Sequence, residues 1–388
     1  MNDFAASWLA QCPLNPDITY LNSGTLGPPL KVVAETVDGM RKRWIENGPG
    51  AAVGIPGADG YLEMMRWTDR ARRSVAAWMK TSPQSVAITG NATDAINMAL
   101  TSIVWHSGDH IVTTSDEHAA LTFPLRLLEK RYNVTVDVVD FPLEGSEDQL
   151  IDSLRTTVKE TTRMVAMSSV SHQSGVALDL SYVLENIPFY SGWVLIDGSH
   201  AAGTHTALLT PRVDFYVFPC HKWLFGPIGT GVLWVGPRAL EETDGILWGA
   251  PMIRENGERY LDREGAWRYE FGTRDWAVAA GIVAAIEFRQ RWTEEEIIEH
   301  YRNLSLSYRA GHSKAGCAAT LTGTGPVLRI QTPGAANIAR DLWTKHRVIV
   351  KPEERAMRIS LPPWLTPRQA EDIGYCIGRE LMAVGDKG

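Results

Sequence analysis

Polar residues of catalytic type follow five of six short apolar segments in the central part of this 388-residue chain. Imidazole, carboxylate and amine side chains act as general acids, bases and nucleophiles, so their repeated placement after apolar segments points to proton-transfer or covalent chemistry. A small glycine-containing turn before a helix also offers free backbone N–H groups to an anion. The stretches concerned are Gly90-Asn91-Ala92-Thr93-Asp94, Asp116-Glu117-His118, Ser171-His172-Gln173-Ser174-Gly175, Asp197-Gly198-Ser199-His200 and Cys220-His221-Lys222-Trp223.

All six apolar segments are expected to be strands. They are short continuous runs rich in Val, Ile and Met, which is typical of strands buried on both faces of a mostly parallel sheet. Helical spacing fills the intervals, so the order predicts a doubly wound α/β domain, in which ligands bind beyond the carboxyl ends of the strands. The expected strands are Val86–Thr89, His110–Thr114, Val134–Val139, Met164–Ser168, Trp193–Asp197 and Asp214–Phe218. The expected helices are Ala92–Ile103, Ala119–Arg131 and Gln149–Val158.

Composition limits the classes of protein to consider. Hydrophobic residues make up 44% and charged residues 21%, as in an ordinary globular protein. The net charge of −7 argues against nucleic acid or an anionic membrane as the main partner, and no apolar run is long enough to cross a bilayer. The start of the chain lacks the features of a signal peptide, and the four cysteines form no CxxC pair. We therefore expect a cytoplasmic enzyme with a small-molecule substrate and no metal site.

Taken together, the strand-end stretches resemble the fold-type I enzymes that use pyridoxal 5′-phosphate (PLP), specifically the class V aminotransferase superfamily. That group includes cysteine desulfurases, cysteine/cystine C–S lyases, kynureninase and isopenicillin-N-epimerase-like proteins. The resemblance spans nearly the whole chain and is most specific in the segment from His221 to Gly231. Further elements are the segments Tyr20–Pro29, Glu117–His118, Ser171–Gly175, Asp197–Gly203, Glu270–Thr273 and Met357–Ser360.

The resemblance implies a role for each of the main site residues. Lys222 would form a Schiff base with the cofactor aldehyde and, once released, move the Cα proton of an amino-acid substrate. Asp197 would pair with the pyridine nitrogen, so that the ring withdraws electrons from Cα. His118 would stack on the ring face. Arg358 would clamp the substrate α-carboxylate through a bidentate pair.

Further roles follow from the same resemblance. Ala92, Thr93 and His221 would hold the cofactor phosphate, and His200 would contact the ring hydroxyl. Thr273 would reach the phosphate from a second subunit, which implies a homodimer with shared active sites.

The resemblance also implies further residues that contact the substrate, and the sequence departs from the family pattern at one position. Asn22, Gln173 and His172 are further candidates for the substrate end. Pro219 stands where relatives usually have Ser, Thr or Asn, so one contact near the phosphate is missing. Ser199 or a backbone N–H would have to replace it.

The change of sequence pattern near Trp276, together with the resemblance, suggests a division of the chain into three parts. Residues 1–30 would be an N-terminal segment that packs on the site and on the small domain. Residues 31–275 would be the large PLP-binding domain, and residues 276–388 a smaller C-terminal α+β domain that begins with a long helix. The Gly-, Pro- and Ala-rich stretch Asn47–Gly60 is either a linker or a mobile loop over the site. The following helix, Tyr61–Lys80, carries four arginines that we interpret as a solvated face: Arg66, Arg70, Arg72 and Arg73.

The cysteines bear on the reaction. Desulfurases need a nucleophilic cysteine shortly before the carboxylate-binding arginine, but the stretch from His346 to Arg358 contains none. Cys317 lies well upstream, and Cys220 is interpreted as a packing residue. A persulfide-forming desulfurase is therefore the least favoured reaction.

β-Elimination needs no extra nucleophile, and the chain looks most like the C–S lyase branch, so we predict a lyase that cleaves a cysteine S-conjugate to a thiol, pyruvate and ammonia. Relatives of this kind act in the biosynthesis of sulfur-containing natural products such as thiosugar antibiotics. Four alternatives stay open: a decarboxylating or oxidative deaminase, an epimerase with His118 or His172 as its second base, an aminotransferase, and a non-catalytic PLP binder. The intact set of Lys222, Asp197 and Arg358 argues against the last of these.

Overall fold

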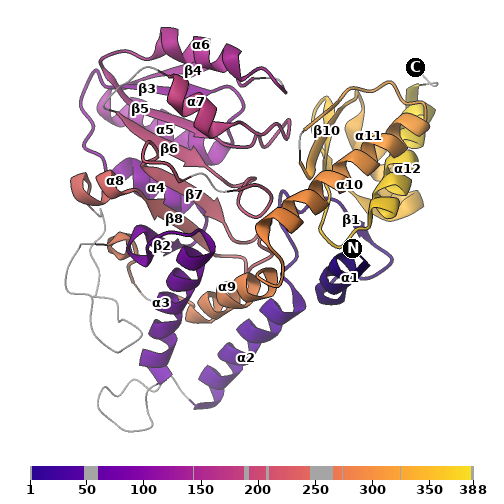
Figure 1. Ribbon diagram of the computed structural model, residues 1–388, viewed down its shortest axis with the longest axis horizontal. Helices are drawn as coiled ribbons and strands as arrows, with labels where there is room; N and C mark the ends of the chain where they lie inside the picture. Colours follow the sequence, from indigo (N-terminus) through magenta and orange to yellow (C-terminus); the bar gives the residue numbers. More distant parts are fainter. Residues whose placement is uncertain are drawn as a thin grey trace.

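The central element is a seven-stranded sheet with the strand order β2-β8-β7-β6-β5-β3-β4 (Figure 1). It is seen in a computed structural model that describes residues 2–47, 60–142, 144–187, 192–206, 209–244, 265–272, 274–323 and 325–385. Strand β8 runs antiparallel to both of its neighbours, and the other strands are parallel to one another. The strands are β2 (Val86–Thr89), β3 (His110–Thr114), β4 (Thr135–Val139), β5 (Thr162–Ser168), β6 (Trp193–Asp197), β7 (Phe215–Pro219) and β8 (Gly231–Val235). The predicted doubly wound α/β fold is confirmed.

Successive strand residues alternate between two apolar cores, one on each face of the sheet. In β5, Val165 and Met167 point into one core, whereas Met164 and Ala166 point into the other. Helices cover both faces, as a buried parallel sheet requires. The first core is closed by α3 (Gly60–Trp78), α6 (Glu147–Thr157), α7 (Leu180–Asn186) and α9 (Trp276–Arg289). The second is closed by α4 (Ala92–Thr101), α5 (Ala119–Tyr132) and α8 (Pro237–Glu242).

A smaller antiparallel sheet of order β12-β13-β10-β9 forms the C-terminal part of the chain (Figure 1). Its strands are β9 (Leu321–Thr322), β10 (Val327–Gln331), β12 (Lys351–Pro352) and β13 (Ala356–Ser360). Its core is shared with α10 (Glu294–Lys314), α11 (Ala335–His346) and α12 (Pro367–Gly385). This sheet supplies the side chains that face the carboxyl ends of the main sheet.

The N-terminal segment is tied to this C-terminal core. Helix α1 (Asn2–Gln11) buries Phe4 and Trp8 in it, and β1 (Thr19–Tyr20) pairs in parallel with β11 (Val348–Ile349). Helix α2 (Lys31–Asn47) instead packs against α9. The division into an N-terminal segment, a large domain and a small C-terminal domain, with boundaries near residues 30 and 275, stays a prediction.

The loop after β7 enters the same C-terminal core. Trp223 and Phe225 are completely buried there, and the ring of Phe225 lies 5.3 Å from that of Trp364. These two aromatic side chains anchor the backbone on one side of Lys222.

Two strands differ from the sequence-based expectation. Strand β8 was not predicted, because Gly231–Val235 is a single short apolar run between a glycine-rich loop and Gly236-Pro237. Strand β4 was expected to be buried on both faces, but it lies at the edge of the sheet and is partly exposed.

The interpretation of the α3 arginines as a solvated face was wrong for Arg72. Its guanidinium is only 1% exposed and donates to Asp69 Oδ1 at 2.7 Å and to Glu270 Oε2 at 2.6 Å. Glu270 Oε1 in turn accepts a 2.8 Å hydrogen bond from the Ile88 N–H in β2. Arg72 therefore joins α3 to the strand that leads into the Gly90 turn.

Two other expectations fall on residues outside the described ranges. The stretch Asn47–Gly60, predicted to be a linker or a mobile loop, lies there for residues 48–59, and so does Thr273. Among the helices that the structure describes, none is both long and apolar enough to cross a membrane.

Candidate active site

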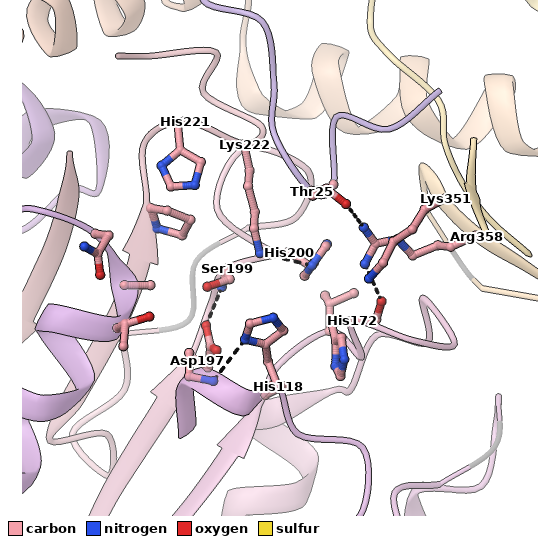
Figure 2. A pocket seen from close by; sticks show the side chains of 18 residues that line it. Thr25, His118, His172, Asp197, Ser199, His200, His221, Lys222, Lys351 and Arg358 are labelled. Atoms are coloured by element: carbon pink, nitrogen blue, oxygen red, sulfur yellow. Dashed lines mark hydrogen bonds between the residues drawn. The ribbon is translucent and has the colours of Figure 1, made fainter. Parts of the chain in front are cut away.

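A cavity of about 190 Å³ lies between the carboxyl ends of the main-sheet strands and the C-terminal sheet (Figure 2). The structure brings most of the predicted site residues together on its walls. These are Ala92, Thr93, His118, His172, Asp197, His200, His221, Lys222 and Arg358. Asn22 and Gln173 are not part of the lining. The lining also includes residues that were not among the predicted site residues, namely Gly24, Thr25, Asn91, Ala120, Ser168, Val170, Ser199, Pro219 and Lys351.

Lys222 sits in the loop after β7 with its amine inside the cavity (Figure 2). Its Nζ lies 3.2 Å from Nε2 of His200. Burial lowers the pKa of Lys222 to about 8; the Asp197 carboxylate opposes this shift and the Arg358 guanidinium adds to it. The neutral amine, the form that a nucleophile or a base requires, is therefore more populated near neutral pH than in an ordinary lysine.

Asp197 and His118 face the same part of the cavity. Asp197 ends β6, and its Oδ1 accepts a 2.8 Å hydrogen bond from the Ser199 N–H. His118 caps α5, with Nδ1 accepting a 3.0 Å hydrogen bond from the Ala120 N–H. This bond fixes the ring orientation and leaves the proton of the neutral ring on Nε2. Burial, followed by the nearby Lys222 amine, lowers the pKa of His118, so the neutral ring is favoured.

The start of α4 forms the anion-binding end of the cavity. The Asn91 side chain caps the helix by accepting a 2.8 Å hydrogen bond from the Asp94 N–H. The N–H groups of Ala92 and Thr93 lie in the first turn, where a helix offers no internal acceptor. Together with the helix dipole they make a site suited to a phosphate. His221 also lines the cavity.

Gly27 fixes the backbone beneath Lys222. Its N–H donates to the His221 carbonyl at 2.7 Å, and a Cβ at this position would stand 2.2 Å from the Lys222 carbonyl oxygen. No side chain fits there unless the Lys222 loop shifts.

Gly27→Ala is expected to lower kcat/KM by about 100-fold, because a displacement of about 1 Å at a catalytic group has that order of effect. Overpacking should also lower the free energy of unfolding by about 1–3 kcal/mol. Steady-state kinetics and urea denaturation measure the two effects. Gly39→Ala, at an exposed position of helix α2 with no neighbouring atom within 4 Å of the added Cβ, is the control and should raise stability by about 0.5–1 kcal/mol. Equal activity of the Gly27→Ala variant and the wild type would contradict the role of this close contact.

Arg358 is held in place at the substrate end. Its Nη1 donates to the His172 carbonyl at 2.8 Å, and its Nη2 donates to Thr25 Oγ1 at 2.6 Å. Thr25 in turn donates to Asn22 Oδ1 at 2.7 Å, so Asn22 lies one hydrogen bond behind Arg358. The sequence pointed to Thr25 only through the Tyr20–Pro29 segment, which is one of the segments that resemble the family.

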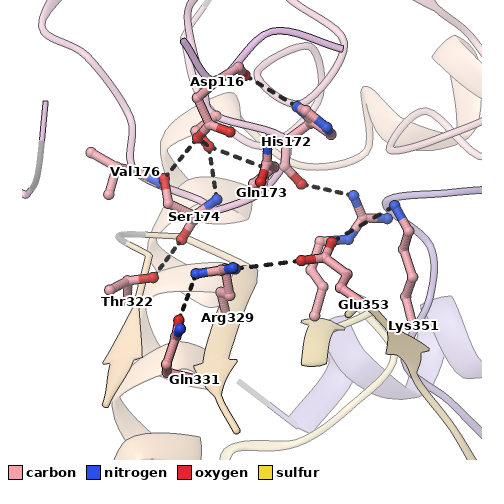
Figure 3. A network of polar contacts seen from close by, with 12 residues as sticks. Asp116, His172, Gln173, Ser174, Val176, Thr322, Arg329, Gln331, Lys351 and Glu353 are labelled. Atoms are coloured by element: carbon pink, nitrogen blue, oxygen red, sulfur yellow. Dashed lines mark hydrogen bonds and ion pairs between the residues drawn. The ribbon is translucent and has the colours of Figure 1, made fainter. Parts of the chain in front are cut away.

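His172 is neutral in this environment. Its Nδ1–H donates to the Asp116 carbonyl at 3.2 Å, and burial lowers its pKa to about 3. The ring meets that of His118 edge to face, with centroids 5.1 Å apart. The same loop is bound to the C-terminal sheet through Thr322 Oγ1, which donates to the Ser174 carbonyl at 3.1 Å (Figure 3). Gln173 contacts this loop through its backbone N–H, which donates to Ser171 Oγ at 3.1 Å.

Two further buried groups, Glu117 and Cys220, have raised pKa values. Glu117 is a buried carboxyl group that accepts hydrogen bonds from Thr114 Oγ1 at 2.5 Å and from Ser168 Oγ at 2.6 Å, and burial raises its pKa to about 7. Cys220 is buried as well, and burial raises the pKa of its thiol to about 12. This high pKa fits its interpretation as a packing residue, because the thiolate is the reactive form.

The residues present fit a phosphorylated pyridine aldehyde. The cavity combines an amine, a carboxylate, an imidazole face and the N-terminus of α4. Within the described part of the chain, the buried Nδ1 atoms of His200 and His221 have no hydrogen-bond partner. Leaving such a group unsatisfied costs about 1–3 kcal/mol, and a bound cofactor hydroxyl or phosphate would offset this cost.

Comparison with known proteins agrees with this chemistry. The model of the class V aminotransferase family matches residues 60–314. The chain is 29% identical over 300 residues to a probable cysteine desulfurase of Pseudomonas aeruginosa, covering 76% of this chain and 73% of the relative. It is 25% identical over 396 residues to the isopenicillin N epimerase of Amycolatopsis lactamdurans, covering 95% and 96% of the two chains.

Solved structures show the same fold. The structure of the cystine C–S lyase C-DES with its reaction product cysteine persulfide superposes with a TM-score of 0.82 at 23% identity, covering 96% of this chain and 99% of that chain. A variant of C-DES with glycine covalently linked to its PLP cofactor gives a TM-score of 0.83 at 23% identity, covering 95% and 98%. The chain belongs to the class V aminotransferase family, and PLP is its cofactor.

Proposed function

We propose that the protein is a C–S β-lyase that cleaves a cysteine S-conjugate. In the net reaction the Cα–H and Cβ–S bonds break, the sulfur leaves with the bonding electron pair and is protonated, and water converts the remaining fragment to pyruvate and ammonia. PLP, when bound, supplies the electron sink that stabilises negative charge at Cα. The reaction needs no oxidant and no second nucleophile.

The chain's own residues divide the work. Asp197 would hold the proton on the cofactor pyridine nitrogen, and His118 would lie against the ring face. Arg358, held by Thr25 and the His172 carbonyl, would orient the substrate α-carboxylate. The Lys222 amine would take the Cα proton and return it to the departing sulfur. Ala92, Thr93 and His221 would hold the phosphate, and Ser199 would supply the hydroxyl that Pro219 lacks.

The observation that carries the proposal is the combination of these groups with the absence of a reactive thiol. Among the residues described as lining the cavity there is no cysteine, and the nearby Cys220 has a strongly raised pKa. A desulfurase transfers sulfur to such a thiol, whereas β-elimination does not need one. The identity to cysteine desulfurases supports PLP chemistry at a cysteine-derived substrate without requiring persulfide transfer.

A panel of S-substituted cysteines, incubated with the PLP-loaded enzyme in deuterated water, tests the proposal. Pyruvate and free thiol in equal amounts are expected from at least one member. Alanine together with protein-bound persulfide would instead mean desulfurase chemistry, and carbon dioxide with an aldehyde would mean a decarboxylating deaminase. Either result without pyruvate would overturn the lyase proposal.

Epimerisation is the second candidate function. Near-complete alignment with the isopenicillin N epimerase supports it, as does the neutral His172 imidazole on the cavity wall. An epimerase would exchange the Cα hydrogen for deuterium in recovered substrate and would form both enantiomers. Chiral chromatography and mass spectrometry of the same reactions distinguish it from a lyase.

We further propose a homodimer in which Thr273 of each subunit reaches the phosphate of the other, and a cytoplasmic location in a pathway to a sulfur-containing natural product. Sedimentation equilibrium tests the dimer directly. Mixing Lys222→Ala with Thr273→Val subunits tests the shared site, because hybrid dimers should regain one intact site.

A further inference from the structure

A row of three cationic side chains crosses the C-terminal sheet at one register position. Arg358 in β13 lies directly opposite Lys351 in β12 on one side and Arg329 in β10 on the other. Residues directly opposite each other in antiparallel strands project from the same face, with Cβ atoms about 4.5–5.5 Å apart. Like charges in this arrangement repel, so the row destabilises the sheet unless negative charge compensates it.

The described residues supply little compensation at the cavity end of this row (Figure 3). Glu353 forms ion pairs with Arg329 at 3.4 Å and, more loosely, with Lys351 at 3.9 Å. Arg329 also donates to Gln331 Oε1 at 2.8 Å. The contacts of Arg358 are to uncharged oxygen atoms, the His172 carbonyl and Thr25 Oγ1. Among the described residues, Glu353 thus forms ion pairs with two of the three cations and lies closer to Arg329 than to Lys351, and Asp116 also interacts electrostatically with Arg329, so the compensating charge lies mainly near Arg329.

Lys351 and Arg358 both line the cavity and both extend toward it, whereas Arg329 does not line it (Figure 2). Burial and the neighbouring Arg358 guanidinium lower the pKa of Lys351, an effect that a bound anion would reverse. A single substrate α-carboxylate would neutralise only one of the two positive charges. The planar Arg358 suits a bidentate carboxylate, while the flexible ammonium of Lys351 suits a group whose position is less fixed.

We propose that Lys351 binds a second carboxylate, carried by the sulfur substituent of the substrate. This inference rests on the proposed lyase function. It narrows the substrates of the lyase to cysteine S-conjugates whose sulfur substituent carries a carboxylate. Arg358 holds the α-carboxylate, Lys222 faces Cα, and Lys351 holds the distal carboxylate. A like-charged pair that costs stability in the free protein then contributes binding energy when the substrate with its two carboxylates enters.

Binding is measured first, with ligands that cannot react. 3,3′-Thiodipropionate is S-(2-carboxyethyl)cysteine without its amino group, and its monoamide lacks one charge. Isothermal titration of the PLP-loaded enzyme should show that the diacid binds at least about tenfold more tightly than the monoamide, as expected for a charge-assisted contact. Lys351→Met should remove this preference by weakening diacid binding alone, and Lys351→Arg should restore part of it. Lys42→Met, whose side chain is 74% exposed, is the matched control.

The outcomes separate the possible roles of Lys351. An equal loss of affinity for both ligands would place Lys351 on the α-carboxylate, and no loss for either would place it outside the site; both results overturn the proposal. Lys351→Met should not lower the Tm, because it relieves repulsion with Arg358. A lower Tm with equal affinity losses would mean a structural role.

Turnover distinguishes failure of this inference from failure of the lyase proposal. S-(2-carboxyethyl)cysteine and S-(2-carbamoylethyl)cysteine differ by one charge at nearly equal size, and the enzyme should favour the acid in kcat/KM. Pyruvate from both at equal efficiency would uphold the lyase and overturn the second carboxylate site. Diacid preference in binding without pyruvate from either would uphold the site and overturn the lyase.

Discussion

Lys222→Ala is expected to lower product formation by the PLP-loaded enzyme by about 10³-fold or more, because it removes the group assigned to Cα proton transfer. The fold should survive, since the backbone around Lys222 is held by the buried Trp223 and Phe225 and by the Gly27 hydrogen bond to His221. Removing the amine also relieves its repulsion with nearby cations, which already lower its pKa. Turnover is followed by pyruvate release, and folding by near-UV circular dichroism and thermal unfolding.

Lys42→Ala, on the exposed surface of α2, is the control for Lys222 and should keep wild-type activity. Added methylamine should restore part of the activity of Lys222→Ala, because a small amine can occupy the vacated space. A folded Lys222→Ala variant with turnover within tenfold of wild type would show that another residue moves the proton. A wild-type protein that binds PLP but turns over no amino acid would instead support the non-catalytic binder.

Arg72→Met is expected to lower the free energy of unfolding by about 3–5 kcal/mol, the usual cost of removing one partner from a buried ion pair. Asp69 and Glu270, whose side chains are 2% and 0% exposed, would each lose a charged partner. Glu270 would then hold the Ile88 N–H less firmly, which disturbs the entry to the phosphate-binding turn. We therefore also expect weaker PLP affinity. Urea denaturation and equilibrium dialysis of PLP measure the two effects.

Arg73→Met is the matched control for Arg72. It removes a 2.9 Å contact to the same Asp69, but its side chain is 52% exposed, so the expected cost is below about 1 kcal/mol. Arg72→Lys keeps the positive charge but cannot donate to Asp69 and Glu270 with two separate guanidinium nitrogens. Its loss of stability should therefore fall between those of the Arg72→Met and Arg73→Met variants. Equal stabilities of the Arg72→Met and Arg73→Met variants would contradict the importance of the buried pair.

Local sequence patterns predict the part of the site that depends on parallel strands. Asp197, His118 and Lys222 each follow an apolar run, and parallel strands bring their carboxyl ends to one edge, so their convergence needs no knowledge of long-range contacts. The roles of these residues in catalysis stay predictions that the variants above address. The family resemblance added PLP and the assignment of Arg358.

Other features depend on contacts that no local pattern encodes. Arg72 looks like a surface residue on a helical wheel, because its partner Glu270 lies 198 residues away. Lys351 occupies a two-residue strand, and only its register with β13 places it beside Arg358. The other strands of the main sheet are predicted from the alternation of strands and helices, which gives parallel strands. Strand β8 is antiparallel to its neighbours, so this alternation does not predict its place between β2 and β7.

The anchoring of Trp223 and Phe225 has a consequence for the order of events during protein synthesis. The core that holds these rings is built from segments that leave the ribosome late, including Tyr301 in α10 and Trp364 just before α12. Arg358 is synthesised late as well. The main sheet can form while the chain is still growing, but the Lys222 loop acquires its final shape only after nearly the whole polypeptide has emerged. We therefore expect PLP to be captured after translation, and nascent chains truncated before β13, which lack both Arg358 and Trp364, should not retain the cofactor.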